Sequence, residues 1–284
     1  MGINITETSA KTILVKSNLP ETDYVINCYT GCEFGCSYCY ASFMGRFVGH
    51  SVSEWGQYVI AKMNAPQLLE KELQKLANRG KGKTIFISSV TDPFQGIETK
   101  YHLTEQCLHV LADFGFEGSV SILTKSPLVL NMIPLLKQLR DVNVGVTITS
   151  TGDAVSRYFE NHAPPASARI ETLRKLNEAG IETYAFVGPL LPHVVSKKQE
   201  IENIFHAISD AGTRRLFIEH INLAPYIRDR MLKELSDVDQ ECIKKFYSSE
   251  SKEHREELNV LLRELVKKYH LELLHGDIII HDKT

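Results

Sequence analysis

The sequence predicts an α/β protein whose core is a parallel β-sheet covered by helices. From residue 84 onward, short runs rich in Val, Ile and Thr alternate with amphipathic segments. These runs are mostly apolar on both faces, as strands of a covered parallel sheet are. The alternation occurs five times, and repeated strand–helix units form right-handed crossovers in one sheet. The pattern alone is compatible with a barrel and with an open doubly wound sheet.

The expected strands follow one another along the chain, and the first lies directly before a cysteine-rich loop. They are residues 24–27, 84–90, 119–125, 142–149, 182–188 and 215–221. Amphipathic helices stand between them and end before glycines. These glycines are Gly80, Gly115, Gly180 and Gly212. A charged helical tail follows, and residues 273–280 are expected to add a terminal strand.

One domain is expected over residues 1–284, with a core of about 22–225 and a helical extension of about 226–284. The net charge of −3 gives no global basic field for nucleic acid. No apolar run reaches the ~20 residues that span a bilayer. The first residues lack the pattern of a signal peptide, so a cytoplasmic location is expected and membrane association is not. Clustered cysteines in that compartment are more often metal or redox groups than disulfides.

Four of the six cysteines are crowded into NCYTGCEFGCSYCYASFM, residues 27–44. They are Cys28, Cys32, Cys36 and Cys39, and the last three have CxxxCxxC spacing. Thiolates are soft ligands suited to zinc or to iron–sulfur clusters. A tetrathiolate zinc site normally uses two pairs separated by a longer spacer. Three sulfurs of this loop can converge more easily than four, and Cys28 is then a small buried residue beside them.

Polar residues gather after the expected strands, at the edge where parallel sheets bind ligands. They are Ser88, Ser89, Thr91, Asp92, Thr124, Lys125, Thr147, Thr149 and Ser150. The cysteine loop follows the first strand at the same edge. A ligand site is therefore expected there.

The motif CxxxCxYC directly after a first strand resembles the radical S-adenosylmethionine (radical SAM) superfamily. Within it, the chain is similar to the branch that holds spore photoproduct lyase. The stretches that carry this resemblance are NAPQLLEKEL (64–73), SSVTDPFQGIE (88–98), LTKSPLVL (123–130) and ARIETLRKLNEAGIET (168–183). The resemblance implies a partial (β/α)6 TIM-like barrel of parallel strands with a helical C-terminal extension.

The resemblance also implies a [4Fe–4S] cluster on Cys32, Cys36 and Cys39. One electron from a flavodoxin- or ferredoxin-type donor would cleave S-adenosylmethionine to a 5′-deoxyadenosyl radical, which abstracts a substrate hydrogen. By matching position, the residues near S-adenosylmethionine are Tyr38, Thr91, Lys125 and Thr147, with Thr149 and Ser150 as neighbours. Lys125 is otherwise a solvated strand-end lysine, and the strand-four threonines are otherwise ordinary β-formers.

The chain departs from the lyase at one position. The lyase returns a hydrogen atom from a cysteine after its second strand, with a tyrosine after the third cluster cysteine as relay. Here Ser89 stands at the thiol's position, whereas Tyr40 is present. A serine O–H bond is too strong to donate a hydrogen atom to a carbon radical. The lyase route is therefore not expected.

The substrate is left open by the sequence. Candidates to line the barrel mouth are Glu98, His102, Glu219, His220, Asn222 and Tyr226, with His220 and Asn222 the first to mutate. Solvated loop residues are the ordinary alternative. A nucleic-acid base or nucleotide is suggested by family analogy alone. The arginines of segment 214–230 would form either a basic rim for phosphates or ordinary element ends. A peptide or a small molecule is the alternative substrate. A non-catalytic zinc protein that uses all four clustered cysteines is the alternative function.

Overall fold

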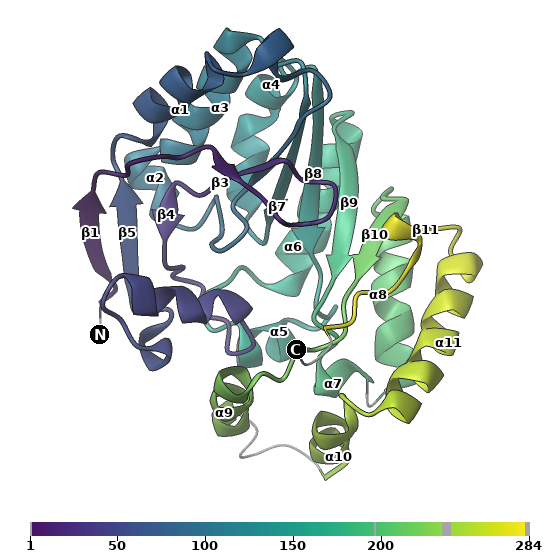
Figure 1. The fold of residues 1–284 in the computed structure, drawn as a ribbon. Helices are drawn as coiled ribbons and strands as arrows, with labels where there is room; N and C mark the ends of the chain where they lie inside the picture. Colours follow the sequence, from purple (N-terminus) through teal and green to yellow (C-terminus); the bar gives the residue numbers. More distant parts are fainter. Residues whose placement is uncertain (1, 196, 235–239, 282–284) are drawn as a thin grey trace. The chain divides into compact units, whose positions relative to one another are not determined.

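Short strands alternate with helices along most of the chain, as the sequence pattern predicts (Figure 1). The computed structural model describes residues 2–195, 197–234 and 240–281. The strands within these ranges are β1 (Asn4–Thr8), β2 (Val15–Lys16), β3 (Tyr24–Ile26), β4 (Tyr29–Thr30), β5 (Tyr58–Lys62), β6 (Thr84–Ile87), β7 (Ser119–Thr124), β8 (Asp141–Thr147), β9 (Glu182–Val187), β10 (Arg215–Ile218) and β11 (Glu272–Leu273). The six predicted core strands are confirmed as β3, β6, β7, β8, β9 and β10.

The main sheet has the strand order β11-β10-β9-β8-β7-β6-β3-β2. The pairs β3–β6, β6–β7, β9–β10 and β10–β11 are parallel, and β2 joins β3 in the antiparallel sense. The order is sequential because each strand–helix unit returns the chain to the next position in the sheet. This mostly parallel sheet confirms the α/β fold class.

A second sheet with the order β1-β5-β4 was not predicted. The strand β1 pairs in parallel with β5, beginning with Asn4 opposite Tyr58. All five residues of β1 are exposed. The sequence NITET therefore shows no apolar alternation from which a strand can be predicted.

The predicted terminal strand over residues 273–280 is wrong in its extent. Only Glu272–Leu273 forms a strand, and a single bridge joins Glu219 to Ile279 further on. His275 and Gly276 lie between them with φ values of 60° and 69°. Left-handed backbone turns the chain and interrupts a ladder.

Helices follow most strands of the main sheet. They are α1 (Ala65–Leu73), α2 (Glu98–Tyr101), α3 (Leu103–Phe114), α4 (Ile133–Leu136), α5 (Asp153–Phe159), α6 (Ala166–Glu178), α7 (Pro192–Val195), α8 (Lys198–Asp210), α9 (Pro225–Glu234), α10 (Gln240–Ser248) and α11 (Lys252–Lys268). The last three confirm the predicted helical tail. Among the described residues, no helix combines the length and the apolar character needed to cross a bilayer.

The chain divides into two compact units. Unit 1 comprises residues 1–35, 41–145 and 178–182, and unit 2 comprises residues 36–40, 146–177 and 183–284. One boundary between them falls inside the cysteine loop and another inside β8. The expectation of a single domain stays a prediction.

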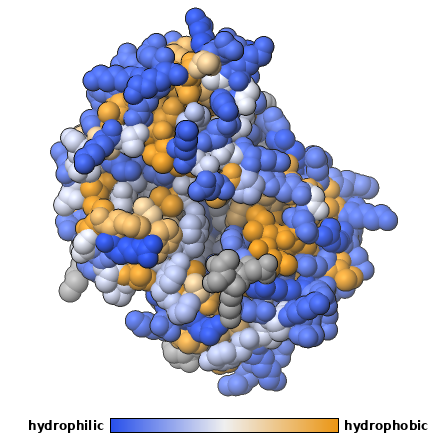
Figure 2. Space-filling model, viewed as in Figure 1, coloured by the Kyte–Doolittle hydropathy of each residue, from blue (hydrophilic) through white to orange (hydrophobic). Residues whose placement is uncertain are grey.

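Each unit has its own apolar core. In unit 1, α1 and α3 pack together, with Leu69 and Leu111 fully buried (Figure 1). In unit 2, α8 packs against α7 and α11, with Phe205 and Leu262 fully buried. The visible surface is largely hydrophilic, and hydrophobic side chains reach it in small patches (Figure 2).

Candidate functional site

The three motif cysteines are divided between the two units. Cys32 belongs to unit 1, whereas Cys36 and Cys39 belong to unit 2. Cys32 and Cys36 are buried, with 7% and 6% exposure, and Cys39 is half-buried. None of the six cysteines of the chain forms a disulfide.

In unit 1, the loop after β6 holds the residues on both sides of the first motif cysteine. The Thr91 hydroxyl donates to the carbonyl of Gly31 at 2.6 Å. The Glu33 N–H donates to Gln95 Oε1 at 2.9 Å, and the Ile97 N–H donates to Glu33 Oε1 at 3.1 Å. The stretch SSVTDPFQGIE thus holds this part of the cysteine loop in place by hydrogen bonds.

Gly31 is required by the same geometry. Its φ of 88° is left-handed, and a Cβ atom there would collide with the backbone and ring of Tyr58. Only glycine adopts this conformation without strain at so close an approach.

Asp92 joins the ends of β6 and β7. Its carboxylate accepts from the Thr124 hydroxyl at 2.6 Å and from the N–H groups of Lys125 and Phe94 at 2.8 Å and 3.0 Å. Burial raises the pKa of Asp92 although these hydrogen bonds and Lys125 oppose the rise. The contact fixes the backbone of Lys125 at the carboxyl end of β7.

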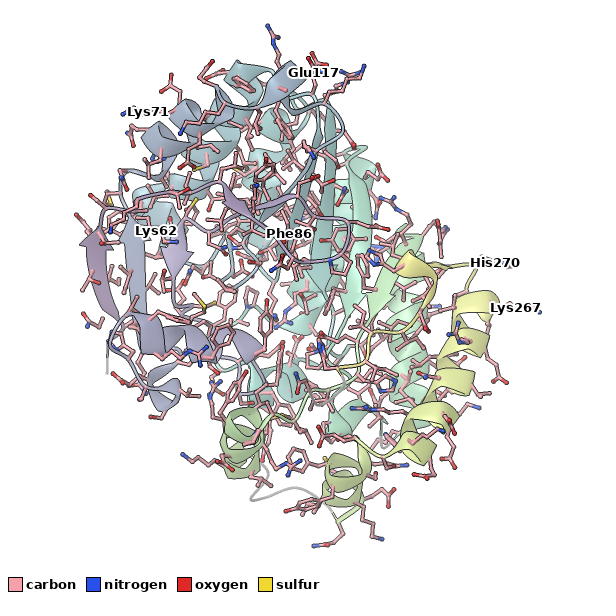
Figure 3. The ribbon with its side chains drawn as sticks, viewed as in Figure 1. Lys62, Lys71, Phe86, Glu117, Lys267 and His270 are labelled. Carbon is pink, nitrogen blue, oxygen red and sulfur yellow. The ribbon has the colours of Figure 1, made fainter. Side chains whose placement is uncertain are left out.

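Ser89 lies beside the residue that precedes the cysteine loop. The Asn27 amide donates to Ser89 Oγ at 3.3 Å, and Lys62 Nζ donates to the Asn27 carbonyl at 2.7 Å (Lys62 is labelled in Figure 3). Burial lowers the pKa of Lys62. The preceding Ser88 has a φ of 65°, which is uncommon for a residue with a side chain. Strained backbone of this kind clusters at functional sites.

Cys28 points to a helix of its own unit. Its thiol lies 3.5 Å from Sγ of Cys107 and donates to the Leu103 carbonyl at 3.7 Å. Cys28 and Cys107 are 0% and 1% exposed. The hydrogen bond from Cys28 and burial raise the pKa of the Cys107 thiol. Cys28 is thus the small buried residue that was expected.

Glu98 and His102, expected near a barrel mouth, differ in burial. Glu98 is buried and accepts a short hydrogen bond from the Tyr29 hydroxyl. Burial raises the pKa of Glu98. His102 is exposed and contacts Glu105 at 2.8 Å.

In unit 2, Tyr38 is held by a buried ion pair. Its hydroxyl donates a short hydrogen bond to Glu160, whose carboxylate pairs with the Arg169 guanidinium at 2.5 Å. The side chains of Glu160 and Arg169 are 0% and 1% exposed. Burial alone would lower the pKa of Arg169, but the charge and hydrogen bond of Glu160, together with Tyr38 and Cys36, outweigh burial and raise this pKa. Burial also raises the pKa of Tyr38, as does the nearby Cys36.

Thr147, Thr149 and Ser150 are all buried at the end of β8. The Thr149 hydroxyl donates to Glu160 at 3.2 Å, and the Ser150 hydroxyl donates to the Gly152 carbonyl at 3.0 Å. Two of the three hydroxyls are thus engaged within unit 2. The structure brings Thr149 and Tyr38 together on one carboxylate.

The residues after β10 are partly internal. His220 is 2% exposed and contacts Asn259 of α11 at 2.8 Å, and burial lowers its pKa. Asn222 accepts from the Ala224 N–H at 3.1 Å. Glu219 contacts His281 at 2.7 Å, a hydrogen bond that raises the pKa of His281.

The backbone of residues 36–40 is anchored from two further elements of unit 2. The Ser37 N–H donates to the carbonyl of Phe159, the last residue of α5, at 2.8 Å. From α9, the Tyr226 hydroxyl donates to the Tyr40 carbonyl at 3.2 Å, and Arg230 Nη2 donates to the Cys36 carbonyl at 3.0 Å. The sequence did not indicate these roles of α5 and α9.

Among the described residues, no three His, Cys, Asp or Glu side chains are already grouped to hold a metal ion. The fit of a cluster therefore rests on the donor set. Three thiols within eight residues, two of them buried, match the soft ligands that iron–sulfur clusters use.

Comparison with known proteins is consistent with this donor set. The family model of the Radical SAM superfamily matches residues 26–208. An uncharacterized protein of Methanocaldococcus jannaschii is 35% identical over 193 residues, which are 68% of this chain and 70% of that protein. Spore photoproduct lyase of Bacillus subtilis is 27% identical over 185 residues, which are 64% of this chain and 50% of the lyase. A solved structure of spore photoproduct lyase complexed with dinucleoside spore photoproduct has a TM-score of 0.69 at 15% identity, covering 95% of this chain and 81% of the other.

Proposed function

Since the chain belongs to the radical SAM superfamily and is a radical SAM enzyme, we propose that it holds a [4Fe–4S] cluster. The ligands would be Cys32, Cys36 and Cys39, and the cluster would work with S-adenosylmethionine. The observation that carries the proposal is the CxxxCxxC loop within the matched region, held on both sides by the chain's own side chains. When bound, the cluster would supply one electron for cleavage of S-adenosylmethionine to methionine and a 5′-deoxyadenosyl radical, and this radical would abstract a substrate hydrogen. A one-electron donor of the flavodoxin or ferredoxin type is the expected partner.

The chain's polar residues would orient S-adenosylmethionine. We assign this role to Tyr38, Thr91, Lys125, Thr147, Thr149 and Ser150. Lys125 carries the positive charge that suits the carboxylate of the ligand, and Asp92 holds its backbone in place. Thr91 and Tyr38 are already tied to the cysteine loop or to its supporting network. Binding of the ligand and positioning of the cysteines would therefore be linked.

Cys28 favours three thiolate ligands over a zinc site of four. Its thiol is engaged with Cys107 and with the carbonyl of Leu103. A tetrathiolate site would require Cys28 to leave this fully buried position. The zinc alternative is thus the weaker one.

For the substrate, we propose a nucleic-acid base or nucleotide. The support comes from the likeness to the lyase and from an exposed aromatic surface directly after the cysteine loop. Phe47 is 64% exposed, and the Arg46 guanidinium lies 4.7 Å from its ring and 5.2 Å from the ring of Phe43. Aromatic rings combined with arginine are what single-stranded nucleic acids stack on. A peptide or a small molecule is the alternative substrate.

Tyr40 and Ser89 are proposed to face the substrate. Ser89 replaces the thiol that the lyase uses, so the fate of the substrate radical must differ from that in the lyase. His220 and Asn222 remain candidates for substrate contact, although His220 is buried against Asn259.

The cluster proposal is tested under anaerobic conditions. The protein is reconstituted with iron and sulfide, reduced with dithionite and mixed with S-adenosylmethionine, and 5′-deoxyadenosine is measured by mass spectrometry. Wild type and Cys107→Ala are expected to form it, and Cys36→Ala is not. A colourless wild-type protein that holds zinc and forms none would refute the proposal.

The substrate proposal is tested with the same assay. Single-stranded oligonucleotides and dinucleosides are compared with peptides for their ability to increase 5′-deoxyadenosine formation. Phe47→Ala is expected to weaken the response to oligonucleotides. The control is Tyr247→Ala, which removes a 66% exposed aromatic ring of unit 2. A response to peptides alone would exclude the nucleic-acid substrate.

A further inference from the structure

Two side chains of α9 contact the cysteine loop in a regular arrangement. Tyr226 and Arg230 are four residues apart, so they lie on the same face of the helix. They donate to the carbonyls of Tyr40 and Cys36, at 3.2 Å and 3.0 Å. These two acceptors bracket Cys39 in the sequence. One helix face thus spans the whole segment that carries the second and third motif cysteines.

The opposite side of this segment is also fixed. The Ser37 N–H donates to the Phe159 carbonyl, and the hydroxyl of Tyr38 is bound by Glu160. The helix α9 packs against α5, whose last residue is Phe159 (Figure 1). All these elements belong to unit 2. The segment 36–40 is therefore held between α9 and the end of α5.

We propose that Tyr226 and Arg230 are positioning residues that keep residues 36–40 in the conformation that receives the cluster, and that the charge of Arg230 favours the reduced cluster. This inference rests on the proposed function, because it assumes a cluster on Cys36 and Cys39. Tyr226, which the sequence suggested as a candidate for the barrel mouth, instead donates its hydroxyl to the Tyr40 carbonyl and is therefore proposed to act by positioning.

The physical reason lies in how metal ligands are held. Groups that hydrogen-bond to ligand residues orient them, and their loss typically costs about 10- to 100-fold in metal affinity or activity. Arginine keeps its charge at all relevant pH values. Adding an electron makes the cluster more negative, so a nearby cation stabilises the reduced form and raises the reduction potential. Tyr226 is neutral, so it orients the ligand residues without raising the reduction potential.

The experiment uses the full chain, reconstituted anaerobically, with four variants. Tyr226→Phe removes one hydroxyl, Arg230→Gln removes the charge, and Arg230→Lys keeps the charge. The matched control is Arg228→Gln, on the same helix, whose side chain pairs with Glu250 at 2.8 Å. The measurements are the rate of iron loss to a chelator, the midpoint potential of the cluster, and the unfolding temperature of the cluster-free protein.

We expect Tyr226→Phe and Arg230→Gln to lose iron about tenfold faster than wild type, the low end of the effect of removing such supporting contacts. Arg230→Gln is expected to have a more negative midpoint potential than wild type. Arg230→Lys keeps the charge, so its midpoint potential should lie close to that of wild type. Tyr226→Phe should leave the potential near that of wild type. Arg228→Gln should match wild type in the rate of iron loss and in the midpoint potential.

The outcomes separate this inference from the proposed function. If wild type binds the cluster but the three test variants behave like Arg228→Gln, the proposed function stands and the inference is wrong. A lower unfolding temperature of Arg230→Gln without a change in potential would assign Arg230 a purely structural role and overturn its electrostatic one. If wild type binds no cluster, both proposals fail together.

Discussion

Replacing Arg169 by Met is expected to destabilise the protein strongly, because it leaves a buried carboxylate without its cation. Arg169 and Glu160 are 1% and 0% exposed, and their charged groups are 2.5 Å apart. Methionine retains much of the apolar stem of arginine, so the substitution changes charge and hydrogen bonding more than volume. Glu160 then faces the hydroxyls of Tyr38 and Thr149 but has lost the guanidinium.

The magnitude follows from the burial of both groups. Removing one partner of a buried ion pair costs about 3–5 kcal/mol, because the remaining charge is uncompensated. A cooperative unfolding entropy of about 2.1 cal/mol/K per residue gives about 0.6 kcal/mol/K for 284 residues. The expected fall in the unfolding temperature is therefore about 5–8 °C.

The loss should depend on pH in a defined direction. Without Arg169, burial raises the pKa of Glu160 in the folded protein above its unfolded value. An acid whose folded pKa is raised gives full stability below the unfolded pKa and loses it as the pH rises through the folded pKa. The deficit of Arg169→Met relative to wild type should accordingly be largest near neutral pH and shrink as the pH falls toward 5.

Thermal and urea unfolding of Arg169→Met measure this effect, with Arg174→Met as the matched control. Arg174 lies on the same helix and pairs with Asp210 at 3.1 Å at the surface. Loss of an exposed pair is expected to cost about 0–1 kcal/mol. The double variant Glu160→Gln/Arg169→Met should recover part of the loss. The reasoning is refuted if Arg169→Met loses no more stability than Arg174→Met.

Three further changes test single groups. Asp92→Asn should lower the free energy of unfolding by about 1–3 kcal/mol in urea, because the amide group cannot accept the hydrogen bonds of both carboxylate oxygens, one of them from the Lys125 N–H; an unchanged midpoint would contradict this. Glu98→Gln should make stability decline less steeply as the pH rises above about 4.5. Burial raises the pKa of Glu98, so the wild type loses the stability of the protonated Glu98 when this group ionises. Equal slopes of the unfolding free energy against pH in both proteins would count against this role. His220→Gln should reduce the loss of stability below about pH 6.5, because burial lowers the pKa of His220 and its protonation opposes folding. The same decrease in the free energy of unfolding at acid pH in both proteins would exclude this role.

The strands of the main sheet were predictable because their signal is local. A run such as YAFV in β9 is apolar on both faces, and this pattern can be recognised within the strand alone. The pairing of β1 with β5 is different in kind. It joins residues 54 positions apart, for example Asn4 and Tyr58, and leaves β1 exposed. A polar five-residue segment has no pattern from which its pairing with a distant strand could be predicted.

The spacing of the cysteines predicts that they are ligands, whereas it does not predict the groups that hold them. Glu and Arg in amphipathic segments usually face solvent, so the pair of Glu160 and Arg169 resembled ordinary surface charge. One signal was present. Arg169 precedes Leu173 and Leu176 by four and seven residues, which places it on the buried face of α6. A charged residue on an apolar stripe indicates a buried partner, although the stripe does not identify that partner.

The cysteine loop itself shows why a motif predicts chemistry before it predicts shape. Residues 31–33 are bound by side chains from about 60 positions away, and residues 36–40 by side chains from 122 to 194 positions away. The loop contributes mostly backbone carbonyls and N–H groups to these contacts, and such groups are the same in every sequence. The supporting residues therefore lie in the loop after β6, directly after α5, and in α6 and α9 rather than in the motif. It follows that the expected donor set can be read from eight residues, while the groups that support these residues in each unit become visible only in the folded structure.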